Sequence, residues 1–134
     1  MTAYLLDTNI CIYLIKKRPI QVFQRLEKVD IFEIGISTIT LGELEYGINK
    51  SSKPNQNKIA LTEFVTPLEL LPFTSQAALE FGKIRWDLER RGKIIGQLDM
   101  LIAAHALSMG CTLVTNNVRE FKRINGLKIE NWAN

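Results

Sequence analysis

Short runs of apolar and β-branched residues alternate with longer segments of helical periodicity along the 134 residues of this chain. Runs of four or so such residues, bounded by turn-forming residues, are typical of buried strands. Strands that alternate with helices predict an α/β layer architecture built on a mostly parallel sheet. The chain length favours one domain, residues 1–134.

The pattern places each element at a defined range of residues. The predicted strands are residues 3–6, 34–37, 70–72, 112–115 and 127–129. The predicted helices are residues 8–16, a segment that begins near residue 20, residues 38 to about 50, a segment that begins near Pro54 and carries Ile59 to Val65, and residues 75–91, about 97–109 and 117–124. Pro72 confines its strand to an edge or an end of the sheet. The helical hairpin at about residues 38–66 is interpreted as a clamp or partner-binding element.

The composition and net charge of the chain exclude few classes of function. The 17 basic and 14 acidic residues give a net charge of +3, which by itself does not establish a nucleic-acid partner. No apolar run approaches the roughly 20 residues that span a bilayer, and the start of the chain lacks the pattern of a signal peptide. We therefore expect a cytoplasmic protein with no membrane association. Cys11 and Cys111 are expected to be small buried apolar residues.

Three acids stand where predicted elements meet. Asp7 follows the first strand, while Glu43 and Asp99 are expected in the first turns of their helices. In open parallel sheets the ligand site lies beyond the carboxyl ends of the strands, so these acids could face one edge of the sheet. Carboxylates suit Mg²⁺, which is commonly held by one or two of them together with a substrate phosphate. This arrangement predicts metal-dependent cleavage of a phosphodiester.

Each acid also has a simpler explanation. Asp7 could be a helix N-cap, Glu43 could complete a capping box with Thr40, and Asp99 could merely complement the helix dipole. The chain would then be a non-catalytic binding module. Asp99, however, lies on a helix that is apolar nearly all round, where a carboxylate is costly unless it is paired or binds a cation. A phosphohydrolase acting on small esters is disfavoured because Asn9 stands where a second aspartate would be needed. The lone histidine, His105, is expected in the core.

Four segments together resemble PIN-domain ribonucleases, and more narrowly VapC-type toxins of type II toxin–antitoxin modules. The segments are Leu6–Asn9, Ile39–Leu44 with Tyr46-Gly47, Asp99–Ala106, and Leu113–Asn117 with Arg119–Phe121. The ending from Gly126 to Trp132 is similar as well. The resemblance covers essentially the whole chain, and its motifs keep their order and spacing.

The resemblance implies a PIN-like three-layer α/β/α sandwich with roughly five strands. It also implies a Mg²⁺- or Mn²⁺-dependent endoribonuclease in which Asp7, Glu43 and Asp99 hold the metal. Asn117 stands where many members carry an aspartate, and Glu120 is the alternative source of a fourth carboxylate. Asn9 and Thr115 are then groups that orient the acids.

The resemblance implies partners too. It implies a homodimer, a cognate antitoxin, and an RNA substrate such as transfer RNA, including initiator tRNA cut near its anticodon. Hydrolysis by a metal-activated water would leave 5′-phosphate and 3′-hydroxyl ends. The basic residues expected to bind RNA phosphates are Arg85, Arg90, Arg91 and Lys93.

Overall fold

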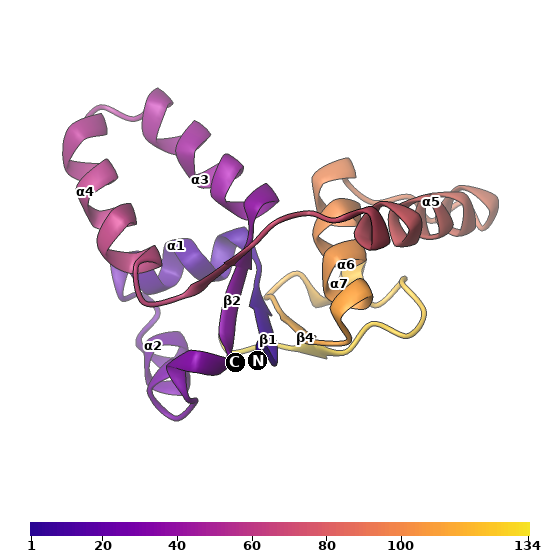
Figure 1. Ribbon diagram of the computed structural model, residues 1–134, viewed down its shortest axis with the longest axis horizontal. Helices are drawn as coiled ribbons and strands as arrows, with labels where there is room; N and C mark the ends of the chain where they lie inside the picture. The colour runs from indigo at the N-terminus through magenta and orange to yellow at the C-terminus, as the bar shows by residue number, and fades with distance from the viewer.

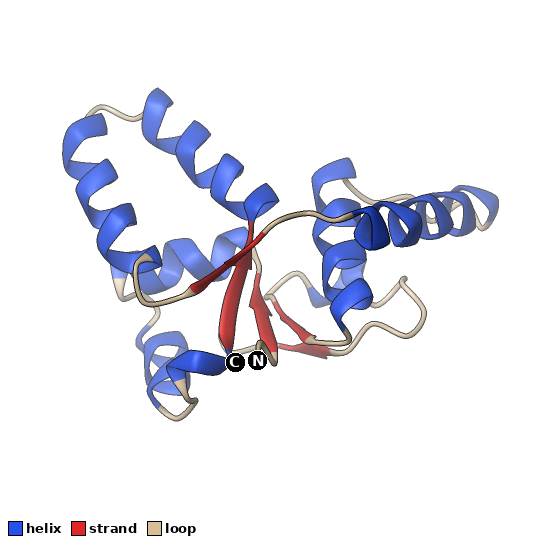
Figure 2. Ribbon diagram, viewed as in Figure 1, coloured by secondary structure: helices blue, strands red, loops and turns tan.

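The computed structural model describes all 134 residues, and its centre is one five-stranded sheet in which every pair of neighbours is parallel. The strand order is β3-β2-β1-β4-β5. The strands are β1 (Tyr4–Leu6), β2 (Ile34–Ser37), β3 (Glu69–Leu71), β4 (Thr112–Val114) and β5 (Ile129–Glu130). Figure 2 shows this sheet between two groups of helices, which confirms the three-layer α/β/α sandwich.

Two apolar cores lie on opposite faces of the sheet, because successive strand residues point in opposite directions. Leu5 and Leu113 belong to one core, and their neighbours Leu6 and Val114 belong to the other. The helices are α1 (Thr8–Lys16), α2 (Ile20–Glu27), α3 (Thr38–Lys50), α4 (Pro54–Val65), α5 (Ser75–Arg90), α6 (Gln97–Met109) and α7 (Val118–Phe121). Helices α1 to α4 supply one core, and α5 to α7 supply the other.

Helix α6 is the central helix of its layer, as its apolar sequence predicts. Six consecutive or nearly consecutive residues of α6 are buried, among them His105, whose side chain is 1% exposed. Gly110 ends α6 in the left-handed conformation, at φ 65°, where a residue without a Cβ is favoured. The prediction of a core histidine is therefore confirmed, as is the burial of Cys11 and Cys111.

Some element boundaries differ from the sequence-based predictions. The helix expected at residues 117–124 is a single turn, Val118–Phe121. The last strand begins at Ile129 rather than at residue 127, because Ile129 and Glu130 are the residues in register with Leu113 and Val114. Gly126 precedes this strand with φ 83°, which interrupts extended structure there. Strand β3 lies at the edge of the sheet, as Pro72 predicts.

The helices give the molecule two arms. Figure 1 shows α3 and α4 rising as a hairpin on one side of the sheet, with α5 and α6 on the other. The chain has no helix whose length and apolar character would carry it across a membrane. The two arms flank the carboxyl end of β1, where Asp7 lies.

Candidate active site

Asp7 occupies the point where the strand order reverses. It directly follows β1, which pairs with β2 on one side and with β4 on the other. In open α/β sheets this switch point is where ligands bind, because the loops leaving the two strands diverge there. The Asp7 side chain is only 4% exposed, so its charge is held in a largely desolvated place.

Thr115, the residue that directly follows β4, holds Asp7. The Thr115 hydroxyl donates to Asp7 Oδ2, and the same hydroxyl accepts the backbone N–H of Asn117 at 2.9 Å. The backbone N–H of Asn9 donates to Asp7 Oδ1 at 3.4 Å, so Asp7 also caps α1. Thr115 therefore contacts Asp7 through its side chain, whereas Asn9 and Asn117 join this network through backbone groups.

Glu43 is placed by α1 rather than by a capping box. The N-cap of α3 is Ser37, whose hydroxyl accepts the N–H of Ile39 at 3.1 Å. Glu43 is therefore the sixth residue of α3, and the expectation that it lies in the first turn is wrong. Its Oε1 instead accepts the hydroxyl of Thr8 at 2.7 Å. Thr8 was missed by the sequence reasoning, although its place beside Asp7 was a usable signal.

Asp99 is the third residue of α6 and forms no hydrogen bond through its carboxylate. Burial, together with the negative charges of Asp7, Glu120 and Glu43 in that order, raises the pKa of Asp99 to about 6. Burial likewise raises the pKa of Asp7; the hydrogen bond from Thr115 opposes this, and Glu43 adds a smaller increase. The structure thus brings Asp7, Glu43, Asp99 and Glu120 within electrostatic reach of one another.

The donor set suits a hard divalent cation held partly through water. No three acidic, histidine or cysteine side chains are arranged so that they could hold a metal ion by themselves. Mg²⁺ does not require such a cage, because it usually keeps several waters and takes one or two carboxylates. A cation beside Asp7 and Asp99 would relieve the repulsion that raises the pKa of Asp99. The residues present therefore fit a Mg²⁺-type ion.

The basic residues of α5 lie mainly in ion pairs along the helix. Arg85 pairs with Glu89 at 3.1 Å, and Arg90 and Arg91 both pair with Asp87, at 2.8 and 2.7 Å. The hydrogen bond from Arg91 is the main reason that the pKa of Asp87 lies below its usual range. Lys93 is exposed and forms no ion pair.

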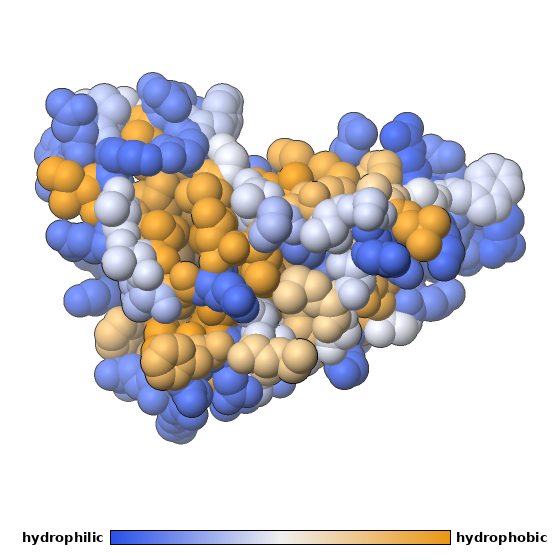
Figure 3. All heavy atoms as spheres, in the orientation of Figure 1, coloured by the Kyte–Doolittle hydropathy of each residue, from blue (hydrophilic) through white to orange (hydrophobic).

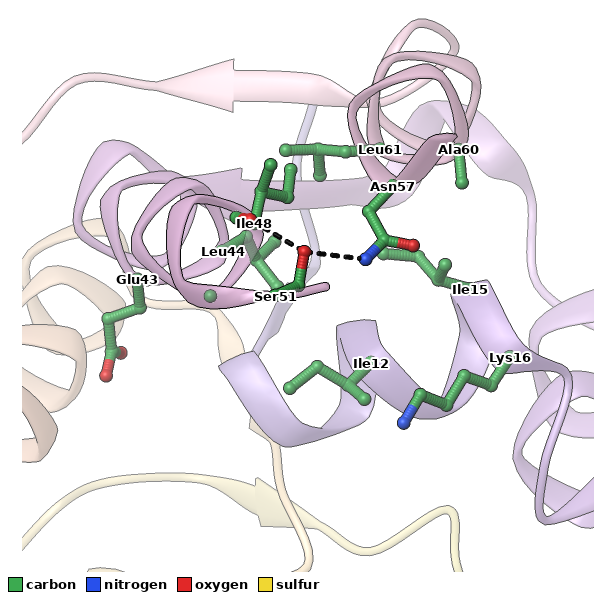
Figure 4. A pocket seen from close by; sticks show the side chains of 11 residues that line it. Ile12, Ile15, Lys16, Glu43, Leu44, Ile48, Ser51, Asn57, Ala60 and Leu61 are labelled. Carbon is green, nitrogen blue, oxygen red and sulfur yellow. Dashed lines mark hydrogen bonds between the residues drawn. The ribbon is translucent and has the colours of Figure 1, made fainter. Parts of the chain in front are cut away.

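An apolar groove runs beside the acids on the outer side of α1. One pocket, of about 280 Å³, lies between α1, α3 and α4, and a second, of about 310 Å³, lies between α1, α2 and α4. Ile15 and Ala60 line both, so the two pockets adjoin, and together they are called the α1 groove hereafter. Figure 3 shows apolar atoms exposed on this face of the α3–α4 arm. In Figure 4 Glu43 stands at the rim of the first pocket, with its carboxylate turned away from Leu61 and Ile15.

Comparison with known proteins identifies the class. The family model of the PIN domain matches residues 4–127. The chain belongs to the PIN domain family, and within it to the VapC ribonucleases.

Its relatives match over nearly their full length. The chain is 47% identical over 130 residues to ribonuclease VapC2 of Rickettsia felis, covering 96% of this chain and 97% of that protein. It is 44% identical over 133 residues to the tRNA(fMet)-specific endonuclease VapC of Salmonella typhimurium, covering 99% and 100%. The DNA-bound VapBC structure from Salmonella typhimurium superimposes with a TM-score of 0.93 at 44% identity, covering 98% of this chain and 99% of that chain.

Proposed function

We propose that this protein is the toxin of a toxin–antitoxin module and acts as a metal-dependent endoribonuclease on transfer RNA, with initiator tRNA as the substrate to test first. The observation that carries the proposal is the group of four carboxylates beside the switch point of the sheet. The substrate follows from the relative named as a tRNA(fMet)-specific endonuclease. The same proposal makes residues 1–134 one catalytic domain in the cytoplasm.

Asp7 and Asp99 are the residues that hold the metal, with Mg²⁺ or Mn²⁺ as the ion, and Glu43 completes the site. When bound, the ion supplies Lewis-acid stabilisation of the scissile phosphate and lowers the pKa of a water. Thr115 keeps the Asp7 carboxylate in one orientation through its hydroxyl. Glu120 is the better candidate for the fourth carboxylate, because its charge acts on Asp99 whereas Asn117 has none to contribute.

Glu43 has the geometry of a group that orients the attacking water. Thr8 fixes one of its oxygens, at 2.7 Å, and leaves the other free to accept a proton. Attack by water leaves a 5′-phosphate and a 3′-hydroxyl. The proposed contacts to RNA phosphates are made by Lys93, Arg85, Arg90 and Arg91. Lys93 can bind a phosphate without first breaking an ion pair, whereas each arginine has one.

The partners are proposed from two uncovered apolar surfaces. The α1 groove, bounded on one side by the α3–α4 hairpin, is the proposed seat of an antitoxin segment that places a cationic side chain near the acids. The solved relatives described as VapBC complexes support a partner of this kind. Leu79 and Trp86, seven residues apart on α5 and 55% and 65% exposed, support a homodimer formed through that helix.

The decisive experiment incubates the purified chain with initiator tRNA and with total RNA, in Mg²⁺ or in chelator. Cleavage in Mg²⁺ alone, with 5′-phosphate ends, supports the proposal. A 2′,3′-cyclic phosphate end contradicts the hydrolytic scheme. RNA binding without cleavage, indifferent to Mg²⁺, leaves the non-catalytic binding module as the function.

A further inference from the structure

One buried polar contact joins the two helices that carry Glu43 and Asp99. His105 Nδ1 lies 2.7 Å from Ser37 Oγ, although the two residues are 68 positions apart. Ser37 ends β2 and caps α3, while His105 lies six residues after Asp99 on α6. Figure 1 shows α3 and α6 on either side of the sheet, and these helices carry Glu43 and Asp99, two members of the acid cluster formed by Asp7, Glu43, Asp99 and Glu120.

The contact is enclosed, and both of its partners can form it without water. The side chains of Ser37 and His105 are 0% and 1% exposed, so water cannot replace either partner. The Ser37 hydroxyl accepts the N–H of Ile39 and retains both a hydrogen and a second lone pair, so it can bond to His105 Nδ1 in either imidazole tautomer. Burial lowers the pKa of His105, which favours the neutral imidazole. The bond therefore couples the start of α3 to the side of α6.

A third segment also contacts the imidazole. The ring of Phe73 packs edge-on against His105, with centroids 5.6 Å apart, and the backbone N–H of Phe73 donates to Thr38 Oγ1 at 3.2 Å. Thr38 is the first residue of α3. The loop before α5, the start of α3 and the middle of α6 thus meet at one histidine. A hydrophobic residue could fill the same volume, but it could not form the hydrogen bond that fixes the position of α6 relative to Ser37.

We propose that His105 is a positioning residue for the acid cluster: its hydrogen bond to Ser37 sets the separation of α3 and α6, and with it the separation of Glu43 and Asp99. This inference rests on the proposed function for its link to metal binding. The helix separation itself is a property of the free chain and is measurable without metal or RNA.

The test compares three variants with the wild type. Ser37→Ala and His105→Phe each remove the hydrogen bond, and His105→Phe keeps an aromatic ring beside Phe73. His105→Asn keeps a polar atom near the position of Nδ1. The matched control is Thr40→Val, since the Thr40 hydroxyl is buried on the same helix yet has no hydrogen-bond partner.

The first measurement is the distance between spin labels on Tyr46→Cys and Leu98→Cys, on α3 and α6, by pulsed dipolar resonance. Both sites are exposed, at 65% and 47%, and the native cysteines are buried, so labelling is selective. We expect Ser37→Ala and His105→Phe to broaden or shift the distance distribution, and His105→Asn and Thr40→Val to preserve it. Because Ser37→Ala also removes the N-cap of α3, a shift in that variant supports the inference only when a His105 variant shows it too, with His105→Leu used if His105→Phe does not fold.

The second measurement is Mn²⁺ binding, followed by the resonance signal of the free ion. We expect Ser37→Ala and His105→Phe to weaken binding roughly tenfold, the low end of the loss seen when a hydrogen bond supporting a metal site is removed. Wild-type distances and wild-type Mn²⁺ affinity in both variants would overturn the inference while leaving the proposed function intact. A wild-type chain that binds no Mn²⁺ and cuts no RNA refutes the function instead, and the label distances still decide the role of His105.

Discussion

The acid cluster and the α1 groove are both energetically unfavourable in the free chain, but for different reasons. At the cluster, Asp7 and Asp99 have raised pKa values because burial and neighbouring carboxylates disfavour their charged forms. In the groove, apolar side chains such as Ile15 remain uncovered. The first deficit is electrostatic and changes with pH and with cations, whereas the second is hydrophobic and nearly independent of both. The two regions share a rim at Glu43 but should respond to different perturbations.

Asp7→Asn should produce the largest effect, and it should act on the cluster alone. The amide keeps the size of the side chain but removes a charge that holds the metal. We expect cleavage of tRNA to fall by at least about a hundredfold, since even an outer partner of a metal site is worth 10–100-fold. The fold should persist because the lost carboxylate is disfavoured by burial. Full activity of this variant in excess Mg²⁺ would end the metal-site proposal, and unchanged binding of an apolar dye would show that the groove is unaffected.

The stability of the metal-free protein should depend on pH, and this second effect should distinguish the acid cluster from the α1 groove. The pKa of Asp99 is about 6 in the folded chain, above its ordinary value of 3.8, so the folded state binds more protons between about pH 4 and pH 6. The free energy of unfolding should therefore fall as the pH rises through this window and level off above it. Below pH 6 Mn²⁺ binding should weaken about tenfold per pH unit, because the ion must displace a proton.

Asp99→Asn is the matched control for that pH dependence. It should remove the Asp99 contribution and stabilise the metal-free chain at pH 7.5 by about 1–2 kcal/mol, after allowance for solvent screening. Thermal unfolding in chelator, at several pH values, measures both effects. A variant that is less stable than the wild type at pH 7.5 would assign Asp99 a structural role.

Ala60→Arg should act on the groove alone. Ala60 lines both pockets, so a long charged side chain there interrupts the groove at its middle. We expect the fluorescence of bound anilinonaphthalene sulfonate to fall several-fold, since this dye reports exposed apolar surface. Mn²⁺ binding should stay at the wild-type value. A loss of Mn²⁺ affinity would show that the groove and the cluster are mechanically connected through α1 or α3.

Lys93→Ala should have the smallest effect and should spare both regions. One lost phosphate contact reduces the slope of log affinity against log salt by about 0.7 for single-stranded and 0.9 for duplex nucleic acid. RNA binding measured over a range of salt, with Asp7→Asn as the background to prevent cleavage, gives that slope. Arg90→Ala is the comparison, because Arg90 has an ion pair with Asp87 to break first. Equal slopes in wild type and Lys93→Ala would make Lys93 ordinary surface.

The parts of the fold that local pattern determines were predictable. Strand β2 and helices α1, α3 and α6 have the predicted boundaries, because β-branched runs, helical periodicity and Gly110 act over a few residues. The closeness of Asp7 to Thr115 follows from parallel strands that end at one edge. The four motifs that resemble PIN-domain ribonucleases likewise led to the family that the comparisons confirm.

Contacts between distant helices were not predictable in the same way. The Thr8–Glu43 and Ser37–His105 hydrogen bonds depend on how α1, α3 and α6 cross above the sheet, which no local signal records. The capping-box interpretation of Glu43 failed for a different, local reason: Ser37 was already available as the cap. The length of α7 was overpredicted because its apolar pattern continues to Ile124 while the backbone does not.

The sharing of Ile15 and Ala60 by the two pockets has a consequence for whatever fills the groove. A chain seated in one pocket has its next residues tethered at the mouth of the other, so the second docking step is intramolecular, with an effective concentration on the order of millimolar. Two individually weak contacts can then add up to a long-lived complex. Proteolytic removal of such an occupant from one end would lower its affinity in two discrete steps, one for each pocket. The rate of proteolysis would then set the rate of its release.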